Sequence, residues 1–393
     1  MALQPAFSET ARGLLPVYGH LPETLDGMLV RIGPRGAGRQ PLSGPQVTAV
    51  RLRDGRAEWV RTSRRGPDRI SCMLGAGPGP RAPGDFGGTR PVGFSAHPEQ
   101  DPVTGELYAA VYHHEAPYVR HVIVDVAGRV RRTEPISVKN ASMMHAYSLT
   151  EHYAVLYDLP VVFSPAAAAG RRFPYAWDDT YGARLGILPR EGADCDVRWI
   201  DIEPCYVFHA MNAYETGNDH LVVDVVRHER AFGREPARPV ETPPALWRWT
   251  VDVCGGTIRE EQLDDRPQEF PVVDARFKGC PCRYGLTTEL TPGSAPYGGR
   301  SLLRHNLPSG TTEIHDLGPG SEAGDPVFVP RSPEAQEGDG WVMTLVRDIG
   351  SGAGKLVVLD TTSFSGDPVA EVWLPSAGSR GFHSSWLPAA GWQ

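Results

Sequence analysis

Residues 47–62 read VTAVRLRDGRAEWVRT, two runs of alternating apolar and polar residues separated by Asp54-Gly55. Alternation with a period of two is typical of a strand with one buried face, and Asp-Gly between two such runs predicts a tight hairpin turn. The same pattern recurs at roughly ten-residue spacing along the chain. It predicts further strands at 107–113, 121–126, 129–133, 246–253, 301–306, 341–347, 355–359 and 370–374.

Helical periodicity is nearly absent and is limited to a short stretch that begins near Ala166 and ends at Gly170. The chain has 393 residues, among them 44 Gly and 37 Pro that are spread along it, which indicates many turns. Evenly spaced strands without a linker predict an all-β fold organised as one domain over residues 1–393. A β-propeller fits this length best, because each four-stranded blade takes about 40–50 residues.

Composition excludes several function classes. The formal net charge of −8 argues against a nucleic-acid partner, which requires a basic face. The sequence has no apolar run long enough for a transmembrane helix, and its first residues lack the pattern of a signal peptide. Six cysteines do not suggest a disulfide scaffold, so we expect reduced thiols and a cytoplasmic location.

Four histidines each follow or end an apolar, strand-like segment: His97, His145, His209 and His383. They are separated by one or more blade lengths. Equivalent positions on different blades of a propeller converge on the central channel, so these side chains are candidates for an all-imidazole metal site. Their spacing alone also fits histidines with ordinary core or surface roles.

Motifs around these histidines occur in a fixed order. They are LDGMLVRIGP at 25–34, AHP at 96–98 with DPVTGE at 101–106, MMHAYSLTE at 143–151, FH at 208–209 with NAYE at 212–215, and GFH at 381–383. In this order, and over nearly the whole chain, the motifs resemble those of the carotenoid cleavage oxygenase family, which includes carotenoid, apocarotenoid and lignostilbene dioxygenases.

The resemblance implies a seven-bladed β-propeller with a cap of loops and short helices. It implies one Fe(2+) per chain, held by His97, His145, His209 and His383. Four neutral imidazoles leave coordination positions open for O2. The implied reaction is cleavage by O2 of a carbon–carbon double bond in a carotenoid-like or apocarotenoid-like conjugated substrate, giving two carbonyl products.

The chain departs from the family in the groups that support these ligands. Imidazole ligands need acceptors for their other ring nitrogen, and the family uses three glutamates. Glu269 matches one of them. Asp325 stands where the family has the second and is one methylene shorter, so we expect it to reach its histidine through water. No residue matches the third, and the segment 63–96 is shortened by about one blade, which predicts one incomplete blade.

Two other functions remain open. A stilbene or phenolic alkene dioxygenase is one, although the lysine that grips the phenol in such relatives is missing with the shortened segment. A non-catalytic propeller that binds a hydrophobic ligand or a protein partner is the other. Residues 161–175 are either an apolar entrance that allows peripheral membrane contact or an ordinary buried loop.

Overall fold

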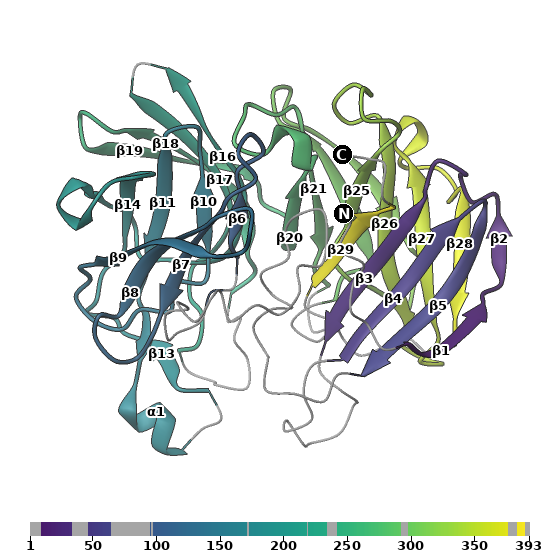
Figure 1. Cartoon of the computed structure of the whole chain (residues 1–393), viewed down its shortest axis with the longest axis horizontal. Helices are drawn as coiled ribbons and strands as arrows, with labels where there is room; N and C mark the ends of the chain where they lie inside the picture. Colours follow the sequence, from purple (N-terminus) through teal and green to yellow (C-terminus); the bar gives the residue numbers. More distant parts are fainter. Residues whose placement is uncertain are drawn as a thin grey trace. The chain divides into compact units, whose positions relative to one another are not determined.

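The computed structural model describes residues 9–33, 46–63, 95, 97–170, 173–217, 219–233, 242–291, 298–375 and 383–389. Within these ranges the chain is almost entirely β-strand (Figure 1), with the single α-helix α1 at Pro165–Gly170. The all-β prediction is therefore confirmed. In the described part of the chain, no helix has the length and apolar character needed to cross a membrane.

The opening hairpin forms as predicted. Strand β4 (Gln46–Arg53) pairs with β5 (Arg56–Ser63), and the turn between them places Asp54 at a φ of 49° and Gly55 at 68°. Positive φ at both central residues is the signature of the type I′ turn, whose twist matches that of the flanking strands. Asp and Gly tolerate this conformation better than other residues, which is why their position marks the turn.

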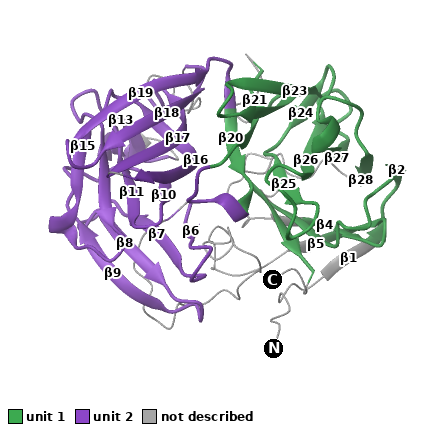
Figure 2. Cartoon of the chain, turned by 90° about the horizontal axis from the view of Figure 1, so that it is seen from above, with its two compact units in different colours: residues 1–83, 269–275, 282–393 green, residues 84–268, 276–281 purple. Residues whose placement is uncertain are grey.

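The chain divides into two compact units, coloured in Figure 2. Unit 1 comprises residues 1–83, 269–275 and 282–393, and unit 2 comprises residues 84–268 and 276–281. The single-domain organisation stays a prediction, and each unit is described by itself.

Unit 2 contains three four-stranded antiparallel sheets, each with its strands in chain order, and one two-stranded sheet. The first sheet consists of β6 (Glu99–Gln100), β7 (Leu107–Tyr112), β8 (Val119–Val124) and β9 (Val130–Ile136). The second consists of β10 (Tyr147–Leu149), β11 (Tyr153–Asp158), β14 (Arg184–Pro189) and β15 (Arg198–Asp201). The third consists of β16 (Tyr206–Gly217), β17 (His220–His228), β18 (Ala245–Asp252) and β19 (Thr257–Asp264). The separate two-stranded sheet consists of β12 (Val161–Phe163) and β13 (Tyr175–Trp177).

The described part of unit 1 contains three sheets, with four, six and five strands. One runs in the order β20 (Gln268–Val273), β21 (Tyr284–Glu289), β22 (Ser301–Asn306) and β23 (Thr311–Asp316), with Gln268 itself assigned to unit 2. The second runs β2 (Val17–Gly19), β28 (Ala370–Leu374), β27 (Gly354–Asp360), β26 (Gly340–Asp348) and β24 (Ser321–Ala323), and β25 (Val327–Pro330) also pairs with β26. The third runs β1 (Glu9–Leu14), β5, β4, β3 (Gly27–Gly33) and β29 (His383–Pro388). Among the described residues of both units, there are also three short 3₁₀ helices: η2 (Asp194–Asp196), η3 (Ala275–Phe277) and η4 (Thr361–Ser363).

In the three four-stranded sheets of unit 2, the second strand is largely buried and the last strand is largely half-buried or exposed. All six residues of β7 and six consecutive residues of β17 are buried, whereas β9 and β19 are largely half-buried or exposed. A strand buried on both faces is sandwiched between neighbouring layers. The second strands of these sheets therefore lie in the core, and each pairs with the first strand of its sheet.

The described residues contain six sheets of four or more strands. The segment predicted to hold the shortened blade, 63–96, lies almost wholly outside the described residues. The blade count and the incomplete blade therefore stay predictions.

Candidate metal centre

Three of the four predicted histidines belong to unit 2, and each lies at the start of a different sheet. His97 precedes β6, His145 precedes β10, and His209 lies within β16. Strand β10 contacts both β6 and β16. The three side chains therefore come from the starts of three successive sheets, whose first strands β6, β10 and β16 neighbour one another.

The three imidazoles meet edge to face. The Nε2 atoms of His97 and His145 are 3.2 Å apart. The ring centroid of His97 lies 4.8 Å from that of His145 and 4.8 Å from that of His209, with interplanar angles of 66° and 88°. The rings of His145 and His209 are 5.8 Å apart. The structure thus brings together three histidines that are far apart in the sequence.

This geometry fits a shared metal ion. Two nitrogen ligands about 2.1 Å from a metal and at a right angle to one another are separated by about 3 Å. The Nε2–Nε2 distance of 3.2 Å matches that spacing. Imidazole ligands suit iron, zinc, copper and nickel, so the donor set indicates a transition metal without selecting one.

A β-bulge directs His209 toward the other rings. Along β16, Val207 pairs with Arg227 and Ala210 with Val225, so two residues of β16 oppose a single residue of β17. A bulge of this kind bends the strand and changes the direction of the bulged side chains. The two bulged residues are Phe208 and His209, and the ring of Phe208 lies edge-on to that of His145 at 5.5 Å.

Backbone hydrogen bonds hold the loop that carries His145. Met143 and Met144 are buried, and the Met143 N–H donates to the Val161 carbonyl at 2.8 Å. The His145 N–H donates to the Met143 carbonyl at 2.9 Å, and the Tyr206 hydroxyl donates to the same carbonyl at 2.8 Å. Sequence reasoning did not single out Tyr206, whose only sequence signal is its place three residues before His209 in an apolar run.

His383 belongs to unit 1, at the first position of β29, where it pairs with Ile32 of β3. Its Nδ1 lies 3.8 Å from Oδ2 of Asp325, which is too long for a direct hydrogen bond. The same Asp325 oxygen accepts the Ser384 N–H at 2.6 Å. Asp325 is thus held beside His383, a pairing that the sequence analysis did not specify.

Asp325 has an unusual electrostatic setting. Burial raises the pKa of its carboxyl group, and the positive charge of Arg31 together with the Ser384 N–H acts in the opposite direction. Arg31 is the second residue that sequence reasoning missed, although it stands as a lone cation in the apolar run 28–32. Burial lowers its pKa, while the charges of Asp325 and Glu322 act against that shift.

Glu269 is also buried in unit 1, with 2% of its surface exposed. Its Oε2 accepts the N–H of Phe270 at 2.7 Å. Phe270 has a φ of 58°, in the left-handed region that a residue with a side chain adopts only under local constraint. The ring of Phe270 lies edge-on to that of His383 at 6.1 Å. Within unit 1, Asp325 therefore lies beside His383, and Glu269 binds the backbone of Phe270, whose ring contacts His383.

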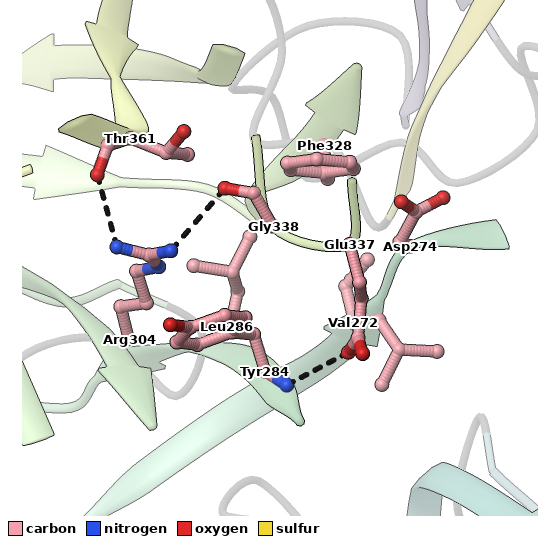
Figure 3. Close-up of a pocket in the computed structure, with 10 residues that line it drawn as sticks. Val272, Asp274, Tyr284, Leu286, Arg304, Phe328, Glu337, Gly338 and Thr361 are labelled. Carbon is pink, nitrogen blue, oxygen red and sulfur yellow. Dashed lines mark hydrogen bonds between the residues drawn. The ribbon is translucent and has the colours of Figure 1, made fainter. Parts of the chain in front are cut away.

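A pocket in unit 1 (Figure 3) is lined by charged and apolar residues and, unlike the histidine cluster of unit 2, by no histidine among the described residues. Arg304 lies over the ring of Tyr284 and donates to the carbonyl oxygens of Thr361 and Gly338, at 2.9 and 3.2 Å. Glu337 accepts the Tyr284 N–H at 2.9 Å. Because these charged groups are engaged by their neighbours, we assign them a structural role in joining strands to loops.

Comparison with known proteins extends these observations. Residues 80–388 match the sequence profile of the family described as retinal pigment epithelial membrane protein. A protein from Mycobacterium tuberculosis named carotenoid cleavage oxygenase is 33% identical, with 98% of this chain and 96% of that protein covered. An isoeugenol monooxygenase from Pseudomonas nitroreducens is 29% identical, with 75% of this chain and 65% of that protein covered.

The fold is also shared with solved structures. The crystal structure of Pseudomonas brassicacearum lignostilbene dioxygenase aligns with a TM-score of 0.85 at 21% identity, covering 98% of this chain and 97% of that one. The solved structures of this fold are β-propellers, so the predicted propeller class is confirmed.

Proposed function

The chain belongs to the carotenoid cleavage oxygenase family, and we propose that it is an iron(II)-dependent dioxygenase acting on a carotenoid-like or apocarotenoid-like substrate. It would cleave one carbon–carbon double bond with O2 and release two carbonyl products. The observation that carries the proposal is the convergence of His97, His145 and His209, whose rings lie within 4.8–5.8 Å of one another.

We propose one Fe(2+) per chain, bound by these three histidines and by His383, which the family motif GFH supplies as the fourth ligand. Bound iron would supply the activation of O2 that carbon–carbon cleavage requires. The protein's contribution is to hold the imidazoles neutral and fixed, and to leave room beside them for O2 and the alkene.

We propose that Asp325 and Glu269 orient ligand imidazoles by accepting their second ring proton. The Asp325 carboxylate lies 3.8 Å from Nδ1 of His383, a separation that supports a bridge by one water. Glu269 is buried and accepts the Phe270 N–H, and a carboxylate can accept several hydrogen bonds at once. An acceptor fixes the tautomer and direction of a ligand ring, which raises metal affinity.

An apolar substrate is supported by the aromatic residues beside His145. Phe208 lies 5.7 Å from Phe232, which stacks on Phe173 at 4.7 Å. Phe173 is partly exposed, so this aromatic series extends from the histidines to the surface of unit 2. Rings in such a series pack against a polyene, exclude water from it and provide no charge that a polar substrate would need.

A phenolic alkene is the second candidate substrate. The isoeugenol monooxygenase among the relatives supports it, as do Tyr112 and Tyr175, whose rings lie 6.0 Å apart in the same unit. Burial raises the pKa of both hydroxyls, to about 12 for Tyr175, so they would act as neutral hydrogen-bonding groups. The binding partners that we propose are thus O2 and a small-molecule substrate, and the net charge of −8 supports no nucleic-acid partner.

We further propose a cytoplasmic protein that contacts membranes peripherally through the surface around α1 and Phe173. Apolar substrates partition into lipid, so an aromatic surface at the end of the Phe208–Phe173 series would take them up directly. Phe173 is 36% exposed, which is a large exposed fraction for a phenylalanine.

The proposal is tested by metal content and product formation. The protein is purified without oxygen, reconstituted with Fe(II), and analysed for bound iron, O2 uptake and aldehyde release with an apocarotenal and with a hydroxystilbene. We expect about one iron per chain, its loss in His209→Ala, and aldehyde from the apocarotenal. Aldehyde formed only from the hydroxystilbene would show that a phenolic alkene is the substrate. Protein that binds no iron and forms no aldehyde would contradict the proposal and favour a non-catalytic binding role.

A further inference from the structure

We propose that Tyr206 is a positioning residue for His145, acting through the backbone carbonyl of Met143. This inference rests on the proposed function, because it concerns how the metal centre is held. Tyr206 is the first residue of β16 and is fully buried, and its hydroxyl lies 2.8 Å from the Met143 oxygen.

The Met143 carbonyl is the acceptor that shapes the turn before His145. The His145 N–H donates to it at 2.9 Å, which closes a three-residue turn with Met144 at its centre. A carbonyl oxygen has two lone pairs, and here one receives the His145 N–H and the other the Tyr206 hydroxyl. Tyr206 therefore fixes the direction of the Met143 carbonyl, which in turn accepts the backbone N–H of His145.

The same strand segment also carries a second metal-site residue. Residues 206–209 contain Tyr206, which bonds the His145 loop, Phe208, which packs edge-on against the His145 ring, and His209 itself. Residues 206–209 thus both carry His209 and contact the loop that carries His145, so this one segment links the positions of the two histidines. Loss of the Tyr206 hydroxyl should release the His145 loop while His209 stays in place.

Packing alone does not account for this hydroxyl. The Tyr206 ring contacts Phe208 at 4.8 Å and Phe232 at 6.3 Å, and a phenylalanine would make the same ring contacts. Tyr206→Phe therefore removes one hydrogen bond and leaves the aromatic cluster filled. Tyr157→Phe is a matched control, because Tyr157 is also buried in unit 2 but its hydroxyl bonds the Ser148 side chain at 2.8 Å.

The experiment compares wild type, Tyr206→Phe and Tyr157→Phe as purified, iron-loaded proteins. Iron affinity is measured by chelator competition, and amide hydrogen exchange is measured for the peptide that contains Met143–His145. For Tyr206→Phe we expect affinity to fall about tenfold, the range seen when an outer group that orients a ligand is lost. We also expect faster exchange confined to that peptide, and neither change in Tyr157→Phe.

Two results would overturn the positioning role: Tyr206→Phe with wild-type iron affinity, whatever its exchange rate, or an equal loss of affinity in Tyr157→Phe. Visible spectra of the Co(II)-substituted proteins add a readout of ligand geometry that a general loss of stability would not change. Wild-type protein that takes up no metal would contradict the proposed function instead, so the two failures are distinguishable.

Discussion

The Nε2 atoms of His97 and His145 lie 3.2 Å apart, although 48 residues separate the two side chains in the sequence. Neutral imidazole has one protonated and one unprotonated ring nitrogen. Two Nε2 atoms that face each other therefore share either a proton or a cation. A metal ion satisfies both lone pairs at once, and it requires that the ring protons lie on Nδ1, where oriented acceptors can receive them.

Removal of one of these rings should abolish tight metal binding. His145→Ala deletes a ligand but leaves the buried Met143-Met144 packing unchanged, so we expect iron content to fall well below one per chain with little change in folding. His113→Ala is the control, since that ring stacks beside His114 near the surface. Elemental analysis of the two purified variants measures the difference, and equal iron in both would contradict the assignment.

Loss of the Asp325 carboxylate should destabilise unit 1. Asp325→Ala leaves the Ser384 N–H without its acceptor and removes one of the two carboxylates, Asp325 and Glu322, whose charges act on the buried Arg31, which should cost about 3 kcal/mol in the free energy of unfolding. Glu261→Ala breaks only the exposed pair with Arg259 and should cost less than about 0.5 kcal/mol. Urea unfolding of both variants gives the comparison, and similar costs would show that Asp325 is not an electrostatic anchor.

Acid should weaken the buried contact between Asp101 and Arg190. Burial acts to raise the pKa of Asp101, but the Val103 N–H, the Thr104 hydroxyl and the Arg190 charge together outweigh it, so the pKa is lowered. A carboxyl group whose pKa is lower in the folded state stabilises that state above its unfolded value, near 3.9.

That stability is lost as the pH falls through the lower, folded-state pKa of Asp101. Asp101→Asn should therefore be less stable than wild type at pH 6, and the difference should shrink as the pH falls below about 4. Urea midpoints across pH 6 to 3 measure it. A difference that stays constant over this range would show that the ionisation of Asp101 does not contribute.

The turn at Asp54-Gly55 should be sensitive to a side chain at Gly55. Its φ of 68° is strained for any residue with a Cβ, while the nearest atom to such a Cβ would be the Leu21 oxygen at 3.6 Å, an ordinary contact. Gly55→Ala should thus cost about 1 kcal/mol from backbone strain alone. Gly13→Ala, where the added Cβ meets nothing within 4 Å, is expected to change stability by less than half as much in thermal unfolding.

Membrane contact through Phe173 is open to a direct measurement. We expect Phe173→Ser to reduce co-sedimentation with lipid vesicles several-fold, because the variant loses an exposed aromatic ring. Ile314→Ser removes a residue of similar exposure, 42%, from strand β23 in unit 1, and should not reduce binding. Equal binding by both variants would remove the basis for contact at this surface.

The sequence alone predicted much of the local structure. Alternating residues and the Asp54-Gly55 turn predicted the first hairpin, because strand periodicity and turn conformation depend on neighbouring residues. Ordered motifs identified the family and the four histidines. The second candidate acceptor, Asp325, was found in the same way, and the structure adds that it lies 3.8 Å from the ring of His383.

The contacts that hold the site were decided only by the tertiary structure. The Tyr206–Met143 hydrogen bond joins residues 63 positions apart, and the charge of Arg31 in β3 acts on Asp325, which lies between β24 and β25. Neither relationship leaves a pattern in the chain, because a periodic sequence records which face of a strand is buried but not which side chain it meets there. Local periodicity thus determined the strands and ordered motifs determined the ligand candidates, whereas the packing of strands against one another determined how His145 and His209 are held in place.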